Sequence, residues 1–195
     1  DSGNRAFGVS IFDVSGKGLH AAMSAVFTSG AFVSETKHSA SPAEILTRLN
    51  VSVYNHSQRG HFVAFLFAVL DLDRKTATFS NAGQTKPLLR TADDVSWLDA
   101  VGVTFPLGMT EFANYQERTT VLHGGDVLIL LTDGLTEAMN ASMESYGNER
   151  LLEFVRQLAV GNLSAQQIAD AINHDIQAFV GAAPQHDDMT IVVVK

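Results

Sequence analysis

Residues 126–134 read Asp-Val-Leu-Ile-Leu-Leu-Thr-Asp-Gly, a run of apolar residues that ends in an aspartate and a glycine. The run is too short for a typical helix and rich in branched side chains, so it predicts a buried strand with Asp133 at its end. Two other stretches follow the same plan. Asp13 closes the apolar run of residues 6–12, and Asp187 with Asp188 precedes the run of residues 189–194. The sequence therefore predicts buried strands that each carry a carboxylate at one end.

These carboxylates suggest a metal site. Carboxylates that gather at strand ends repel one another unless a cation compensates their charge. Ligands that offer only oxygen select a hard ion such as Mg²⁺ or Mn²⁺. Each turn alone also fits an ordinary strand-to-helix turn with a capping aspartate, but three such turns together favour a metal site at Asp13, Asp133 and Asp187.

The composition limits the class of protein. With 195 residues and 46% hydrophobic residues, the chain is long enough for one domain with a large core. It has no cysteine, which excludes disulfides, thiolate zinc sites and a cysteine nucleophile and is compatible with a reducing cytosol, so we expect a cytoplasmic protein. The net charge of -8 argues against binding to a nucleic-acid backbone. No apolar stretch reaches the roughly 18 to 20 residues that span a bilayer.

Helices are predicted before and after a central series of strands. A helix over 18–36 carries an apolar stripe, and Ser41, Pro42 and Glu44 form a capping-box signature for a second helix. Strands are expected within 61–70, 76–80, 87–90, 95–98, 115–122 and 127–132, the last two joined by a Gly124-Gly125 turn. Caps at Asn148 and Ser164 open two further helices. Strands that are apolar on successive residues must be covered on both faces, so we expect stacked sheets with helices outside.

The order of several short motifs resembles a known family. These are Asp13-Val14-Ser15-Gly16-Lys17-Gly18, Asn81-Ala82-Gly83-Gln84, Pro106-Leu107-Gly108, Gly125-Asp126-Val127-Leu128, Thr132-Asp133-Gly134-Leu135-Thr136-Glu137-Ala138 and Asp187-Asp188-Met189-Thr190. They occur in the order seen in the metal-dependent PP2C-type serine phosphatases, and the chain is most similar to the bacterial SpoIIE/RsbU branch. The resemblance covers nearly the whole chain, and the ordered set is specific although each motif is weak alone.

The resemblance implies an α+β fold, a four-layer α-β-β-α sandwich of two mainly antiparallel sheets flanked by helices. It also implies two Mn²⁺ or Mg²⁺ ions that activate water for catalysis. Asp13 would bridge both ions, the carbonyl of Val14 would complete one of them, and Asp133 and Asp187 would hold the other. Asp188 stands where related phosphatases often have Asn, which implies a supporting role.

One family feature is missing, since a Gly-Asp motif normally lies on a strand just before the position of residue 1. We therefore expect residues 1–195 to form a single phosphatase domain that lacks its first strand and an upstream regulatory region. The resemblance implies that the substrate is a phosphoserine or phosphothreonine monoester on a STAS-type anti-sigma antagonist. It also implies that an upstream sensor or receiver domain regulates the phosphatase. Homodimerisation stays open, whereas nucleic-acid binding and membrane insertion are not expected. The alternatives are a catalytically silent pseudophosphatase that acts in partner switching and an unrelated two-metal nuclease, which the net charge disfavours.

Overall fold

The computed structural model describes residues 5–56 and 60–195. The chain divides into two compact units. The first unit contains residues 1–84 and 100–122, and the second contains residues 85–99 and 123–195. Over the described residues the fold is α+β, with two antiparallel four-stranded sheets and five α-helices. The prediction of two mainly antiparallel sheets with helices is confirmed.

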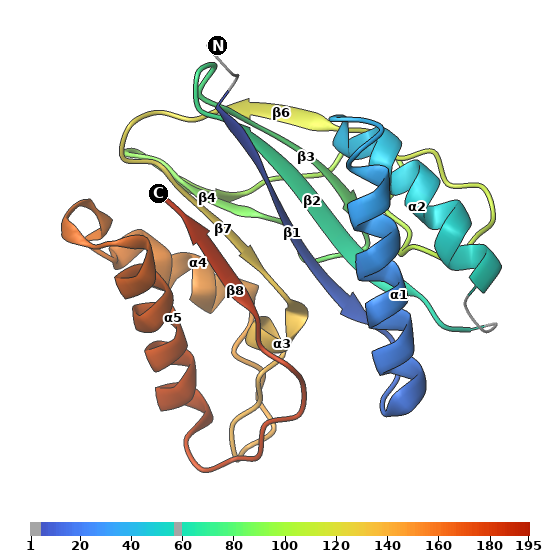
Figure 1. Cartoon of the computed structure of the whole chain (residues 1–195). Coiled ribbons are helices and arrows are strands. Elements are labelled where there is room, and N and C mark those ends of the chain that lie inside the picture. Colours follow the sequence, from blue (N-terminus) through green and yellow to red (C-terminus); the bar gives the residue numbers. More distant parts are fainter. Residues whose placement is uncertain (1–4, 57–59) are drawn as a thin grey trace. The chain divides into compact units, whose positions relative to one another are not determined.

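The sheet of the first unit has the strand order β1-β2-β3-β6 (Figure 1). Its strands are β1 (Ala6–Val14), β2 (Val63–Asp71), β3 (Thr76–Ala82) and β6 (Arg118–Val121). Helices α1 (Leu19–Glu35) and α2 (Pro42–His56) follow β1 in the chain. Because β1 pairs with β2 along its whole length, with Asp13 opposite Ala64, the register of the sheet fixes where β1 ends.

Aromatic and aliphatic side chains join these helices to β2. Phe32 of α1 packs against Phe65 and Phe67, with ring centroids 5.1 and 4.9 Å apart. Leu46 and Leu49 of α2 are fully buried in the same cluster. Such aromatic pairs stabilise a core beyond the area they bury. The helices are thereby anchored to the strand beside β1.

The apolar stripe predicted for α1 does not form the core of the first unit. The helix itself is confirmed, but Leu19, Met23, Val26 and Val33 are exposed, and Thr28 is the buried residue of the helix. The periodicity of a sequence shows which side chains share a helix face, but not whether another element covers that face.

The start of α2 differs in detail from the predicted capping box. Ser41 Oγ accepts a hydrogen bond from the Glu44 amide, as expected. The Glu44 carboxylate, however, accepts from Ser39 Oγ instead of the Ser41 amide. The Glu117 carboxylate accepts from Ser41 Oγ and the Ala43 amide, so a distant residue supplies the charge at this helix start.

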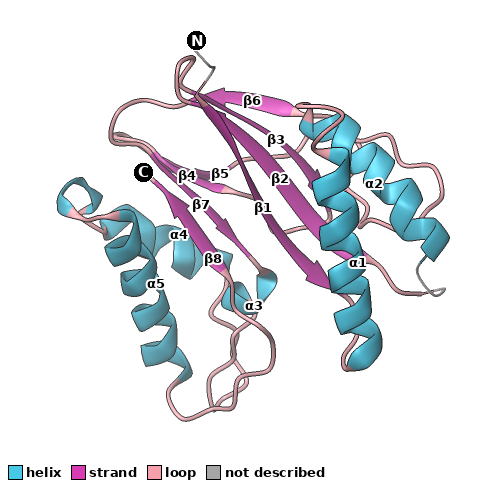
Figure 2. Ribbon diagram, in the orientation of Figure 1, coloured by secondary structure: helices cyan, strands magenta, loops and turns pink. Residues whose placement is uncertain are grey.

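The sheet of the second unit has the strand order β5-β4-β7-β8 (Figure 2). Its strands are β4 (Leu88–Arg90), β5 (Val95–Trp97), β7 (Val127–Leu131) and β8 (Ile191–Val194). The unit also contains α3 (Asp133–Thr136), α4 (Asn148–Gln157), a 3₁₀ turn (Val160–Asn162) and α5 (Ala165–Val180). Alternate residues of β7 pack with apolar residues of α4 and α5 in one cluster. The central strand β7 is buried at every residue, so its end is a fixed point of the unit.

Two local predictions for the second unit are wrong, and one is confirmed. The Gly124-Gly125 turn does not close a hairpin, because β6 pairs with β3 and β7 pairs with β4 and β8. Asn148 is the first residue of α4, whereas Gly147 occupies the cap with a φ of 82° that suits glycine. Ser164 and Gln167 form the predicted capping box of α5. Each helix in the described part of the chain falls short of the length and apolar character that a membrane span requires.

Candidate metal centre

Asp133 stands where β7 turns into α3. Thr132 is extended, and Asp133 begins the helix. The Asp133 carbonyl accepts hydrogen bonds from the Glu137 amide at 2.8 Å and from Thr136 Oγ1 at 3.1 Å. These bonds fix the main chain of Asp133, although Asp133 as a whole is exposed to solvent. A buried strand followed by one tight turn thus presents a carboxylate at a defined place.

Thr132 ties this turn to the segment before β8. Its hydroxyl donates to the Asp188 carbonyl at 3.1 Å and accepts from the Thr190 amide at 3.0 Å. The main-chain amide of Thr132 donates to the Thr190 carbonyl at 3.1 Å. Because Thr132 is only 3% exposed, solvent cannot easily replace these hydrogen bonds. Thr132 therefore fixes the backbone that carries Asp187.

Gly134 allows the same two segments to approach closely. A Cβ atom at position 134 would collide with the carbonyl oxygen of Asp188 and would lie 3.5 Å from Cβ of Asp187. Glycine is used here for its missing side chain and not for an unusual φ angle. Glycine is therefore required at position 134 because any side chain would clash with the segment that carries Asp187 and Asp188.

The carboxylates of Asp133 and Asp187 lie together in the second unit. They offer oxygen atoms within 4.8 Å of each other, and both residues are exposed. Asp187 Oδ1 accepts from the Asp188 amide at 2.8 Å, and the Asp187 carbonyl accepts from Gln185 Nε2 at 2.7 Å. Two anionic oxygen donors at this spacing suit a hard divalent cation, which would also relieve their repulsion. The donor set fits Mg²⁺ or Mn²⁺.

Asp188 takes part through its main chain. Its carbonyl accepts from Thr132 and its amide donates to Asp187. Both bonds hold the Asp187 segment in place, which is a positioning role. A direct role of the Asp188 carboxylate at a metal ion stays a prediction.

Asp13 and Val14 lie at the end of β1 in the first unit. Asp13 Oδ1 accepts from the Val14 amide at 2.9 Å, the same local bond that Asp187 makes with Asp188. Beyond the strand end, Ser15 exchanges hydrogen bonds with Phe62 through its amide at 3.0 Å and its hydroxyl at 2.9 Å. These bonds fix the backbone directly after Asp13, so its carboxylate also has a defined orientation.

The motif at residues 81–84 is structural in the first unit. The Asn81 side chain accepts from the Gln84 amide and donates to the Gln84 carbonyl, both at 2.8 Å. Gly83 has a φ of 79°, and a Cβ there would collide with Pro106. The motif therefore forms a tight turn that packs against the Pro106 segment.

The segment around Pro106-Leu107-Gly108 is also held in place. Leu107 forms an antiparallel bridge with Val63, and the Gly108 amide donates to Asn50 Oδ1 at 2.9 Å. From sequence alone, residues 102–109 could form a mobile segment, or Pro106-Leu107-Gly108 could be only a tight turn. These bonds favour the ordered turn.

Sequence reasoning missed Thr132 as a site residue. A threonine at the end of a strand is common, so its place in the motif did not mark Thr132 as a residue of the site. The available signal was a hydroxyl residue directly before the predicted ligand Asp133, at a buried position where a polar group needs partners.

Comparison with solved structures places this fold among the PP2C phosphatases. The PP2C phosphatase domain of SpoIIE from Bacillus subtilis, solved with a fragment of its regulatory domain, matches with a TM-score of 0.78 at 21% identity over 96% of this chain and 54% of that chain. A structure of RsbX in complex with magnesium matches with a TM-score of 0.68 at 15% identity over 99% of this chain and 82% of that chain. At these identities the comparison establishes the fold alone.

The family follows from the sequence. The family model described as stage II sporulation protein E (SpoIIE) matches residues 3–195, and the chain therefore belongs to the SpoIIE family. The chain is 25% identical over 189 residues to the phosphoserine phosphatase RsbU of Bacillus subtilis, a match that covers 96% of this chain and 55% of RsbU. The chain thus spans about half the length of this relative. The resemblance found in the sequence is confirmed.

Proposed function

We propose that this chain is a metal-dependent protein serine/threonine phosphatase that hydrolyses a phosphoserine or phosphothreonine monoester. The carboxylate pair of Asp133 and Asp187 carries the proposal, because it offers a hard-cation site in a chain of the SpoIIE family. Membership of a family with PP2C phosphatases and the similarity to the phosphoserine phosphatase RsbU support it.

In this proposal Asp13 and the Val14 carbonyl would serve as ligands to Mn²⁺ or Mg²⁺, which would supply the hydrolytic chemistry when bound. Asp133 and Asp187 would hold a divalent ion in the second unit, and Asp188 would support Asp187. The fixed backbones at both aspartates of the second unit favour this role, because a ligand that is already oriented loses less entropy on binding. The magnesium complex of the structurally similar RsbX agrees with the choice of ion.

The ligand carboxylates accept hydrogen bonds and bind cations but need not attack phosphorus. When bound, divalent ions supply a hydroxide nucleophile near neutral pH and neutralise phosphate charge. The contribution of the chain is to orient the carboxylates and to hold their negative charges close together. Asp187 is oriented by the Asp188 amide and Asp13 by the Val14 amide.

We further propose that the substrate is a phosphorylated STAS-type anti-sigma antagonist and that an upstream sensor or receiver domain controls the enzyme. Membership of the SpoIIE family supports the proposed class of substrate. The regulatory fragment in the SpoIIE structure supports the proposed regulation by an upstream domain.

The deciding experiment compares the wild-type chain with Asp13→Asn on a phosphoserine peptide at saturating Mn²⁺. We expect a loss of kcat of about a thousandfold, because a metal ion contributes several kcal/mol to the stability of the transition state. Asp170→Asn is the matched control, since Asp170 is an exposed residue of α5 that pairs with Gln166. Equal turnover of wild type and Asp13→Asn would refute the assignment. A wild-type chain that binds Mn²⁺ and hydrolyses no phosphopeptide would favour the silent interaction module.

A further inference from the structure

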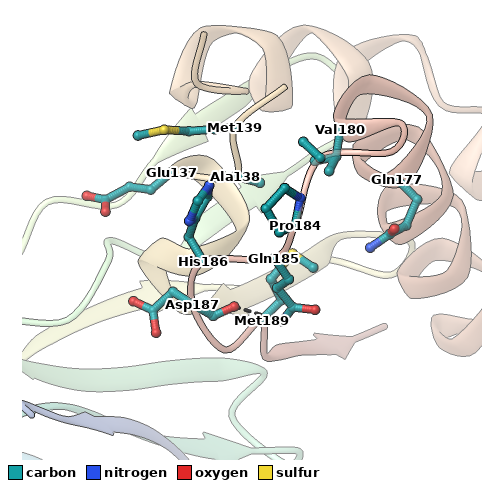
Figure 3. A pocket seen from close by; sticks show the side chains of 12 residues that line it. Glu137, Ala138, Met139, Gln177, Val180, Pro184, Gln185, His186, Asp187 and Met189 are labelled. Carbon is teal, nitrogen blue, oxygen red and sulfur yellow. Dashed lines mark hydrogen bonds between the residues drawn. The ribbon is translucent and has the colours of Figure 1, made fainter. Parts of the chain in front are cut away.

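A cavity of about 180 Å³ lies in the second unit beside Asp187. Figure 3 shows side chains from the loop after α3, from the end of α5 and from residues 184–189 around it. Its walls are mainly apolar and include Ala138, Met139, Val180, Pro184 and Met189. This hollow is a feature that the predicted phosphatase chemistry does not by itself require.

The cavity adjoins the candidate metal centre. Gly134 and Asp187, which meet at that centre, also line the cavity. A substrate whose phosphate is held at Asp133 and Asp187 would therefore place its neighbouring residues at the entrance of this hollow.

The chemistry of the walls favours an apolar group over the phosphate itself as the occupant. The described residues that line the cavity include the polar residues Gln177, Gln185 and His186 but no lysine or arginine, the usual partners of a phosphate. The carboxylates of Glu137 and Asp187 point away from Val180 in Figure 3. The carboxylates at the edge would repel an anion, and the walls inside are mainly apolar. An aliphatic side chain would instead be stabilised in the cavity, because its apolar surface is removed from water.

The size of the cavity fits one side chain. An engineered apolar cavity of about 150 Å³ in another protein binds benzene, whereas sites for cofactors and drug-sized ligands measure about 300 to 1,000 Å³. A hollow of about 180 Å³ is therefore large enough for a leucine or methionine side chain and too small for a cofactor.

The walls are held in place before any ligand binds. The Tyr146 amide donates to the Ala138 carbonyl at 2.8 Å, and the Tyr146 hydroxyl donates to Asp175 at 2.6 Å. Burial and the hydrogen bond to Asp175 raise the pKa of Tyr146, so its hydroxyl stays protonated and remains a donor. Arg150 lies over the ring of Phe179, next to the wall residue Val180. A preformed hollow costs less to fill than one that must open.

We propose that this cavity is a substrate subsite that takes an aliphatic side chain, leucine or methionine, close to the phosphoserine of the substrate protein. The proposal rests on the phosphatase function proposed above. An extended peptide advances about 3.3 to 3.6 Å per residue, so a side chain within about three residues of the phosphoserine can reach a hollow that begins at Asp187. The cavity would then select the sequence around the phosphoserine, while the metal ligands act on the phosphate.

The test uses the Mn²⁺-loaded chain and phosphoserine peptides in which one leucine moves through the positions on either side of the phosphoserine, in an alanine and glycine background. At one placement we expect leucine to raise kcat/KM about tenfold over alanine, the usual range for added methylene groups in an apolar pocket. The readout is the ratio of kcat/KM for the leucine and alanine peptides.

Three variants locate the effect. Ala183→Leu fills the cavity and Met139→Glu places a charge on its wall, so each should bring the ratio close to one. Ala182→Leu is the matched control, because Ala182 is exposed and does not line the cavity, and it should keep the wild-type ratio. Circular dichroism confirms that each variant is folded. The second cavity variant decides the question if the first one fails to fold.

A ratio near one in the wild-type chain at every placement would overturn the subsite, as would a preference that survives Met139→Glu. If no peptide is hydrolysed, the proposed phosphatase function fails, and the subsite is then tested by binding alone. The fluorescence anisotropy of labelled peptides should show tighter binding of the leucine peptide to wild type and Ala182→Leu than to Met139→Glu. Equal affinities for the leucine and alanine peptides would reject the subsite in that case.

Discussion

Replacing Thr132 by valine removes one hydroxyl and keeps the shape of the side chain. The change deletes the hydrogen bonds to the Asp188 carbonyl at 3.1 Å and from the Thr190 amide at 3.0 Å. Each of these partly buried hydrogen bonds contributes about 0.5 to 1.5 kcal/mol. The main-chain bond between Thr132 and Thr190 remains in the variant. We therefore expect Thr132→Val to lower the free energy of unfolding by about 2 kcal/mol.

The same variant should weaken metal binding, because Asp187 is carried by the backbone that Thr132 holds. Loss of a group that orients a metal ligand commonly costs about 10- to 100-fold in affinity. Isothermal titration with Mn²⁺ measures this change, and urea unfolding without metal measures the stability. Thr132→Ser keeps a hydroxyl at this position and should retain most of the wild-type Mn²⁺ affinity and most of the free energy of unfolding. A folded Thr132→Val protein with the wild-type Mn²⁺ affinity would show that the position of Asp187 does not depend on this hydroxyl.

Further predictions address the ligands, the close contact and the control of activity. Asp133→Asn and Asp187→Asn should each weaken binding of one Mn²⁺ ion more than the other, and calorimetry that finds unchanged stoichiometry and affinity would remove them from the site. Gly134→Ala should destabilise the protein by about 1 to 3 kcal/mol, because its Cβ collides with the Asp188 carbonyl. Gly161→Ala, which meets nothing within 4 Å, is its control in thermal unfolding. Joining the chain to the proposed upstream regulatory segment should raise activity or make it depend on a signal, since a shift of about 1 Å at a ligand changes rates about a hundredfold. Equal rates with and without that segment would contradict this coupling.

The strands were predictable because short apolar runs are a strong signal. The strands expected within 61–70 and 76–80 appear nearly there, as β2 (Val63–Asp71) and β3 (Thr76–Ala82). The pairing of strands was less accessible, since adjacency in sequence favoured a hairpin between β6 and β7 that the structure does not contain. A turn such as Gly124-Gly125 permits a hairpin but does not require one.

The sequence predicted the candidate metal ligands but not the residues that hold those ligands in position. A carboxylate at the end of an apolar run marked Asp133 and Asp187, and the structure brings these two together. The role of Thr132 depends on a partner 56 residues away in the chain. The need for glycine at position 134 likewise depends on the approach of Asp188. Such long-range contacts leave no local pattern in a single sequence.

The contact between Thr132 and Asp188 also has a consequence for folding. The chain between these residues contains α4 and α5, which pack on β7 in the native structure, so Asp133 and Asp187 meet across a long loop of the chain. An unfolded chain would have to close this long loop to hold a cation with both carboxylates, which costs entropy. A cation that binds both should thus favour the native state alone, and at a hundred times its Kd it would add about 2.7 kcal/mol to the free energy of unfolding. The melting temperature would then report the supply of divalent ions, and a chelator would make the second unit easier to unfold.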